Sequence, residues 1–206
     1  TVAHLVENVP APVKGIVGPW VHQYPHTAVP GPAIGFLQEA IRWWDRWLKG
    51  IENGAEHDPA YRVYMLDSEA PDASAKHRAG HWVAEAVWPS PRVSRKVLAL
   101  GAEMAGALPA RVNTPQHLGL QAGEFFPMGL NAEMPGDQRQ DDALSTCFDG
   151  PVLAEPLDLL GAARLTLRLG SDKPLAFLVA RLCDVAPDGA SVRLALGMLN
   201  LCHRDG

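Results

Sequence analysis

The spacing of apolar residues changes character near Gly50. Before it, residues 13–17 form a short apolar run closed by Gly-Pro, which is typical of a buried strand. Three prolines then interrupt residues 20–32 and disfavour helix there. Residues 33–49 lack proline and repeat apolar residues at steps of three and four, which predicts an amphipathic helix that Gly50 ends. The first fifty residues therefore read as strand, loop and helix, as in an α/β protein.

Beyond this point the period of the pattern shortens to two, as in strands with one buried face. Residues 61–66 read as a strand, and residues 162–169 alternate leucine or alanine with arginine or threonine. Residues 175–185 and 191–199 predict an antiparallel hairpin, because the intervening Ala-Pro-Asp-Gly favours a tight turn. Residues 109–142 show weak periodicity, and we expect long loops with short strands there. This second part is predicted to be a β-sandwich.

The predicted helix is unusually aromatic. Trp43, Trp44 and Trp47 lie within about one helical turn. Most of that aromatic area needs a covering surface, and one strand of its own unit supplies little. We therefore expect this chain to be a piece of a larger protein.

Composition narrows the class of protein. The chain has 18 Lys and Arg against 23 Asp and Glu, a net charge of −5, which argues against a nucleic-acid partner and an anionic membrane partner. No apolar run reaches the ~18–20 residues of a membrane span, and no signal peptide is visible. Hydrophobic residues make up 47% and charged residues 20%, the balance of a globular protein. The 19 glycines and 18 prolines favour many turns.

The cysteines and histidines form no metal or disulfide pattern. Cys147, Cys183 and Cys202 are odd in number and lie in no C-x-x-C pair, so we expect buried free thiols in a reducing, cytoplasmic setting. His22 and His26 have the H-x-x-x-H spacing of a zinc-binding helix, but a proline stands between them. We therefore expect neither a metal nor an organic cofactor.

The sharpest candidate for chemistry is His22, at the end of the sequence Gly-Pro-Trp-Val-His at residues 18–22. It follows the carboxyl end of the first predicted strand, where open α/β sheets bind ligands. An imidazole there can act as a general base, or it can simply satisfy backbone groups of the loop. Trp20, two residues earlier, is a candidate substrate-binding residue.

Longer motifs resemble a known family. Residues 18–26 read Gly-Pro-Trp-Val-His-Gln-Tyr-Pro-His, and a tryptophan-rich helix follows; residues 181–191 read Arg-Leu-Cys-Asp-Val-Ala-Pro-Asp-Gly-Ala-Ser. Together with Asp-Gln-Arg-Gln-Asp-Asp at residues 137–142, they resemble the CocE/NonD hydrolases, relatives of the X-Pro dipeptidyl-peptidases of peptidase family S15. The resemblance implies that residues 1–50 end an α/β-hydrolase domain. It also implies that residues 51–206 form most of a C-terminal jelly-roll β-sandwich of galactose-binding-like type.

The resemblance further implies a serine hydrolase with a Ser–Asp–His triad, in which His22 is the catalytic histidine. No Gly-x-Ser-x-Gly occurs, so the serine and the aspartate are expected outside this chain, and the chain alone is expected to be inactive. The expected substrate is a small acyl ester or a peptide, and a homodimer is a candidate assembly. The alternative is a non-catalytic β-sandwich module that binds carbohydrate or a protein partner, with Trp82 and Trp88 as its aromatic platform.

Overall fold

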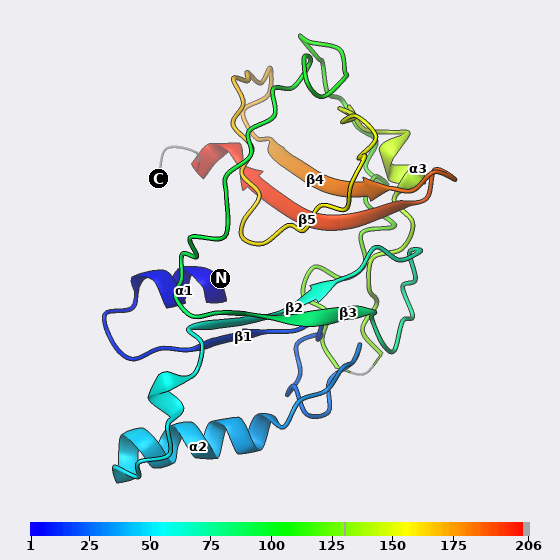
Figure 1. Cartoon of the computed structure of the whole chain (residues 1–206). Coiled ribbons are helices and arrows are strands. Elements are labelled where there is room, and N and C mark those ends of the chain that lie inside the picture. The colour runs from blue at the N-terminus through cyan, green and yellow to red at the C-terminus, as the bar shows by residue number, and fades with distance from the viewer. Residues whose placement is uncertain (130, 204–206) are drawn as a thin grey trace.

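The computed structural model describes residues 1–129 and 131–203, and its strands form two sheets (Figure 1). The first sheet has the order β1-β2-β3, with β1 parallel to β2 and β2 antiparallel to β3. Its strands are β1 (Gly15–Val17), β2 (Tyr61–Leu66) and β3 (Gly80–Glu85). The predicted strands at residues 13–17 and 61–66 are thus both present, the first in shorter form.

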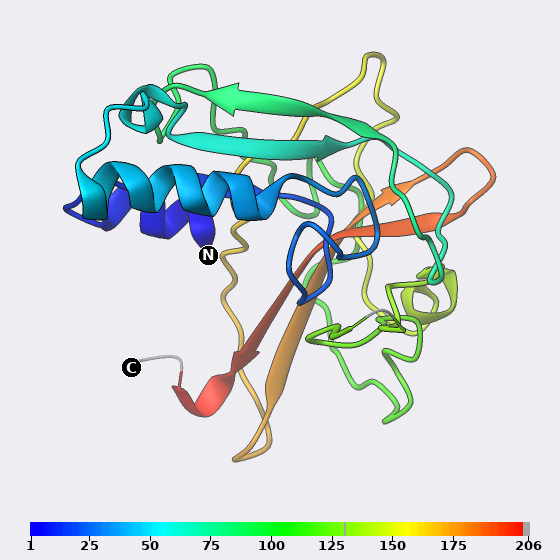
Figure 2. The same ribbon diagram turned by 90° about the horizontal axis from the view of Figure 1, so that it is seen from below.

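The second sheet is the predicted hairpin. β4 (Phe177–Val185) and β5 (Ser191–Asn200) are antiparallel, and a register shift lies between Leu182 and Cys183. Gly189 in the connecting turn has φ of 84°, a conformation that glycine adopts without strain. The hairpin lies on the side of the first sheet opposite α2 (Phe36–Lys49), and its strands run obliquely to β2 and β3 (Figures 1 and 2).

The helices are few and mostly short. α2 begins after Gly35 rather than at residue 33, because the Ile34 carbonyl accepts from the Phe36 amide in a tight turn, two residues on rather than the four of a helix. It ends as predicted, with Gly50 in the left-handed conformation at φ of 71°. The remaining helical segments are α1 (Val2–Asn8), η1 (Ala55–His57), α3 (Arg139–Asp142) and η2 (Leu201–His203).

A glycine allows α1 to approach the first sheet closely. A Cβ atom at Gly15 would lie 2.8 Å from methyl carbons of Val2 and Val6, and 2.9 Å from the Tyr61 ring. These distances are too short for carbon atoms in contact, so only glycine fits at this position. The sheet therefore lies between α1 and α2 (Figure 1).

The strand predicted at residues 162–169 is wrong. This segment has no regular secondary structure and is exposed throughout, with Leu165, Leu167 and Leu169 between 41 and 47% exposed. Alternation supplies two faces, but a strand also needs a neighbour to hydrogen-bond, and β4 and β5 pair only with each other. Residues 109–142 are mostly loops, as expected, but the short strands expected there are wrong, because the part of this stretch that the structure describes contains α3 and no strand.

The chain is mainly β, in agreement with the predicted class. The jelly-roll arrangement, the hydrolase origin of the first unit and the division at residue 50 stay predictions. One feature bears on that division, since β1 and β2 come from opposite sides of residue 50 and pair in one sheet.

Candidate active site around His22

The loop that follows β1 folds back on itself and carries His22. The Val21 amide donates to the Val29 carbonyl at 2.9 Å, and the Ala28 amide donates to the Tyr24 carbonyl at 3.0 Å. Val21 and Ala28 are each 4% exposed, so the loop has a small apolar core of its own. This core positions the intervening residues without help from a helix.

His22 is exposed at the surface of this loop. Its backbone amide donates to the Pro127 carbonyl at 2.8 Å, and its ring lies 4.4 Å from the Phe126 ring, measured between centroids, with the planes tilted by 39°. Within the part of the chain that the structure describes, no hydrogen bond or ion pair engages the imidazole nitrogens. The ring is therefore fixed on one side and open to a reacting group on the other.

Trp20 lies in the same loop but makes contacts of its own. Its indole N–H donates to the Pro32 carbonyl at 2.8 Å, which joins the two ends of the loop. Its ring covers Gly18, where a Cβ atom would lie 2.6 Å from ring carbons. On the other side it contacts Trp82 of β3, with 6.2 Å between ring centroids. The predicted substrate-binding role of Trp20 stays a prediction beside this packing role.

The two tryptophans of the alternative binding module do not share a surface. Trp82 packs edge-on against Tyr64 with 5.3 Å between centroids, and Trp88 packs against Tyr61 at 4.8 Å. Tyr61 and Tyr64 are three positions apart on β2 and so point to opposite faces of the sheet. No common aromatic platform results from this arrangement.

The expected burial of the cysteine thiols is wrong for Cys147 and Cys202, which are exposed, and Cys183 is only half-buried.

The histidine pair His22 and His26 lacks a third metal ligand. Across residues 1–129 and 131–203, no group of three or more His, Cys, Asp or Glu side chains is placed to hold a metal ion. His26 instead stacks on Phe36, with ring planes only 5° apart.

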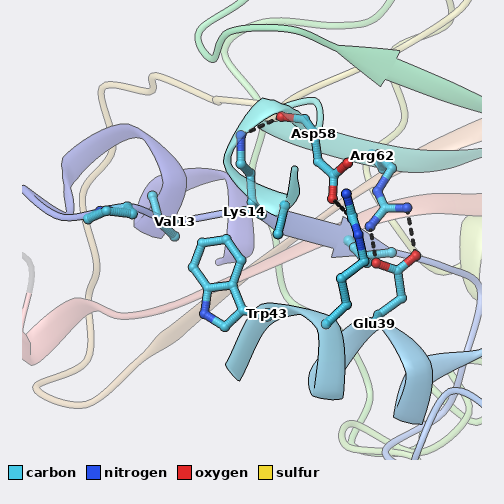
Figure 3. Close-up of a pocket in the computed structure, with 10 residues that line it drawn as sticks. Val13, Lys14, Glu39, Trp43, Asp58 and Arg62 are labelled. Carbon is cyan, nitrogen blue, oxygen red and sulfur yellow. Dashed lines mark hydrogen bonds and ion pairs between the residues drawn. The ribbon is translucent and has the colours of Figure 1, made fainter. Parts of the chain in front are cut away.

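A pocket of about 260 Å³ lies between α2 and the first sheet (Figure 3). Arg62 donates two hydrogen bonds to the Glu39 carboxylate, at 2.9 and 2.8 Å. The hydrogen bond from the Arg62 guanidinium lowers the pKa of Glu39. Arg42 pairs with Asp58, and Lys14 donates to the backbone carbonyls of Glu56 in η1 and of Asp58 just after it. Because these charges already have partners, we assign the pocket a role in attaching α2 to the sheet.

A buried polar cluster links residues 137–142 to the hairpin. Gln138 is 0% exposed, and its amide donates to the carbonyls of Gln121 and Gly136 at 2.6 and 2.9 Å. Its side-chain oxygen accepts from Arg181 of β4 at 2.8 Å, and Arg181 also pairs with Asp142 at 2.8 Å. Two of the motifs that carry the family resemblance are therefore in direct contact, which gives them a structural role.

The contact between His22 and Phe126 was not predicted from the sequence. Phe126 lies in a loop region of weak periodicity, and no motif marks it as a neighbour of His22. Only the folded arrangement reveals the pair.

Comparison with known proteins shows that this chain is related to hydrolases. The family model of the X-Pro dipeptidyl-peptidase C-terminal non-catalytic domain matches residues 53–206. The chain belongs to this family, and the CocE/NonD resemblance is confirmed. It is 24% identical, over 227 aligned residues, to the cocaine esterase of Rhodococcus sp. (strain MB1 Bresler).

That alignment covers 95% of this chain and 37% of the esterase. The chain thus spans little more than a third of the length of this curated relative. No solved structure matches the chain. No helix among the described residues is long and apolar enough to cross a bilayer. His22 and Trp20 precede the region that the family model covers, whereas Trp82 and Phe126 lie within it.

Proposed function

We propose that this chain is part of a serine hydrolase that cleaves acyl ester or amide bonds, with His22 as its general base and acid. The observation that carries the proposal is the exposed imidazole of His22, held at its backbone and open at both ring nitrogens, just beyond β1. The similarity to an esterase supports the same chemistry. The substrate is a small acyl ester or a peptide, with N-terminal X-Pro dipeptides included.

The proposed role of His22 follows from proton transfer. The imidazole accepts the proton of a serine hydroxyl as the serine oxygen attacks the substrate carbonyl. It returns that proton to the departing alcohol or amine, and an acyl-enzyme remains. It then takes a proton from water as the water oxygen attacks the acyl carbonyl, and it returns this proton to the serine oxygen as the acyl–serine bond breaks and the acid leaves. The serine and an orienting aspartate are supplied from outside these 206 residues.

The test uses the complete reading frame that contains this sequence. His22→Ala should lower kcat/KM for a p-nitrophenyl ester by about 10⁴-fold or more, as loss of a triad member does in serine proteases. His57→Ala is the matched control, because His57 is another exposed histidine, in η1. It should change kcat/KM by less than about threefold, within the spread expected of a surface substitution. A His22→Ala enzyme that retains more than about a tenth of the activity contradicts the proposal.

The 206-residue chain assayed by itself provides a second arm of the same experiment. It should hydrolyse the ester no faster than free imidazole at the concentration of its eight histidine side chains, because it has neither the nucleophilic serine nor the orienting carboxylate of a triad. A fluorophosphonate probe should label the complete protein but not this chain. Labelling of a serine within the chain would overturn the proposed location of the nucleophile.

A further inference from the structure

His22 is held by residues 126–128, which are about a hundred positions away in the sequence and lie within the region that the family model matches. Phe126 contacts one face of the imidazole, and the Pro127 carbonyl accepts the His22 amide hydrogen. Met128 forms an isolated parallel bridge with His22, so the two backbones run side by side at this point. Three consecutive residues of one loop thus constrain both the backbone and the ring of His22.

The root of this loop segment is anchored to the rest of the protein. The Ala122 carbonyl accepts from Arg193 of β5 at 2.7 Å, and the Gln121 carbonyl accepts from the buried Gln138 at 2.6 Å. The Gln121 amide donates to Asp141 at 3.2 Å, and Asp141 is 3% exposed. The segment is therefore fixed at residues 121–122 by the hairpin and the Gln138 region, and it reaches His22 at residues 126–128.

We propose that Phe126 is a positioning residue for His22, and that through it a domain described as non-catalytic sets the orientation of the catalytic imidazole. This inference rests on the proposed function of His22. A catalytic imidazole has to present one nitrogen to the nucleophile in a narrow range of directions. The imidazole is otherwise free to rotate about its Cβ–Cγ bond. Phe126 restricts that rotation by covering one ring face, while the Pro127 hydrogen bond holds the backbone from which the ring projects.

The first measurement needs no activity. In NMR spectra of the 206-residue chain, the Phe126 ring current should shift the carbon-bound protons of the His22 imidazole, whose signals are assigned with His22→Asn. Phe126→Ala should move these signals toward the values of a free histidine, and more than it moves those of any other histidine. Phe125→Ala is the matched control, because Phe125 is the adjacent ring, 78% exposed, and makes none of the ring contacts found around His22. Equal spectra for Phe126→Ala and the unsubstituted chain overturn the proposal.

The second measurement uses the complete reading frame. Phe126→Ala should lower kcat about three- to tenfold, the range expected for loss of one aromatic contact, and should leave KM within about twofold. Phe126→Tyr keeps a ring at the same place and should restore kcat. A loss of activity that appears only in KM, or that the tyrosine does not rescue, contradicts the positioning role.

The two arms separate this inference from the function on which it rests. If Phe126→Ala moves the His22 signals while His22→Ala leaves hydrolysis intact, the contact exists but the proposed function fails. If His22→Ala abolishes hydrolysis while Phe126→Ala changes neither signals nor kcat, the function stands and the positioning role fails. Circular dichroism of each variant confirms that it is folded.

Discussion

Gln138 shows how a single polar residue can organise a region that has little regular structure. It is 0% exposed, and its side chain joins the Gln121 and Gly136 carbonyls to Arg181 of β4. A buried amide is tolerated only where its donors and acceptor are satisfied, and here three partners satisfy them. The motif that includes Gln138 therefore has a structural explanation that does not involve catalysis.

Replacing Gln138 with alanine should leave these partners unsatisfied in the interior. We expect Gln138→Ala to lower the free energy of unfolding by about 2–3 kcal/mol, the range for buried groups that lose their hydrogen bonds. Gln140→Ala, two positions along and exposed, should change it by less than about 0.5 kcal/mol. Urea unfolding followed by circular dichroism measures both values. Equal losses for the two variants would show that the buried hydrogen bonds are not what stabilises this region.

At the scale of elements, α2 is unusual because it turns charged residues toward the sheet and leaves large apolar residues exposed. Its face toward the sheet carries the ion-paired Glu39 and Arg42, and Trp43 lines the same pocket (Figure 3). Large apolar residues instead lie exposed on the helix, at 40 to 75% exposure: Leu37, Ile41, Trp44, Trp47 and Leu48. From the sequence we expected one strand to cover little of the tryptophan surface of this helix. Trp44 and Trp47 are indeed 54% and 40% exposed. The periodicity of a helix defines two faces, but the charged partners on the sheet decided which face turned inward.

The ion pair between Glu39 and Arg62 should make stability depend on pH. Arg62 lowers the pKa of Glu39 in the folded protein below its unfolded value near 4.5. The stabilisation is therefore complete above about pH 4.5 and is lost as the pH falls through the lower, folded-state pKa. We expect Glu39→Gln to cost about 0.5–1 kcal/mol at pH 7, as partly exposed pairs do, and much less at pH 3.

Urea unfolding at the two pH values measures this difference. Glu52→Gln is the control, because Glu52 is exposed and outside these ion pairs. It should have little effect at either pH. A Glu39→Gln penalty that is the same at pH 3 and pH 7 would rule out the charge pair as its cause.

At the scale of the whole molecule, the first sheet joins the two predicted units. β1 pairs with β2 through Gly15↔Tyr61, Ile16↔Arg62 and Val17↔Val63. Tyr61 and Val63 are 6% and 9% exposed in this arrangement, and α2 attaches to β2 through Arg62. The units are thus continuous in structure even though their hydrophobic patterns differ.

Removal of residues 1–50 should therefore destabilise what remains. Chain 51–206 would leave one edge of β2 unpaired, and edges of this kind favour aggregation. We expect it to elute as aggregates in size-exclusion chromatography and to unfold at lower urea concentration than the whole chain. A monomeric 51–206 of equal stability would establish it as an independent folding unit.

Much of this protein follows from local sequence signals. The end of α2 at Gly50, the strand at residues 61–66 and the hairpin with its Pro-Asp-Gly turn all depend on residues close together in the chain. The loop that carries His22 was also predicted, from the three prolines within residues 20–32. Such signals act over a few residues, so one sequence suffices to identify them.

Only the tertiary structure decided which distant segments meet. Residues 162–169 alternate like a strand yet have no partner, whereas β1 finds one in β2. The same holds for Gln138 with Arg181 and for His22 with Phe126, whose contacts join different parts of the chain. The physical reason is that periodicity specifies a face of each element, whereas pairing and burial depend on what the rest of the chain brings to that face.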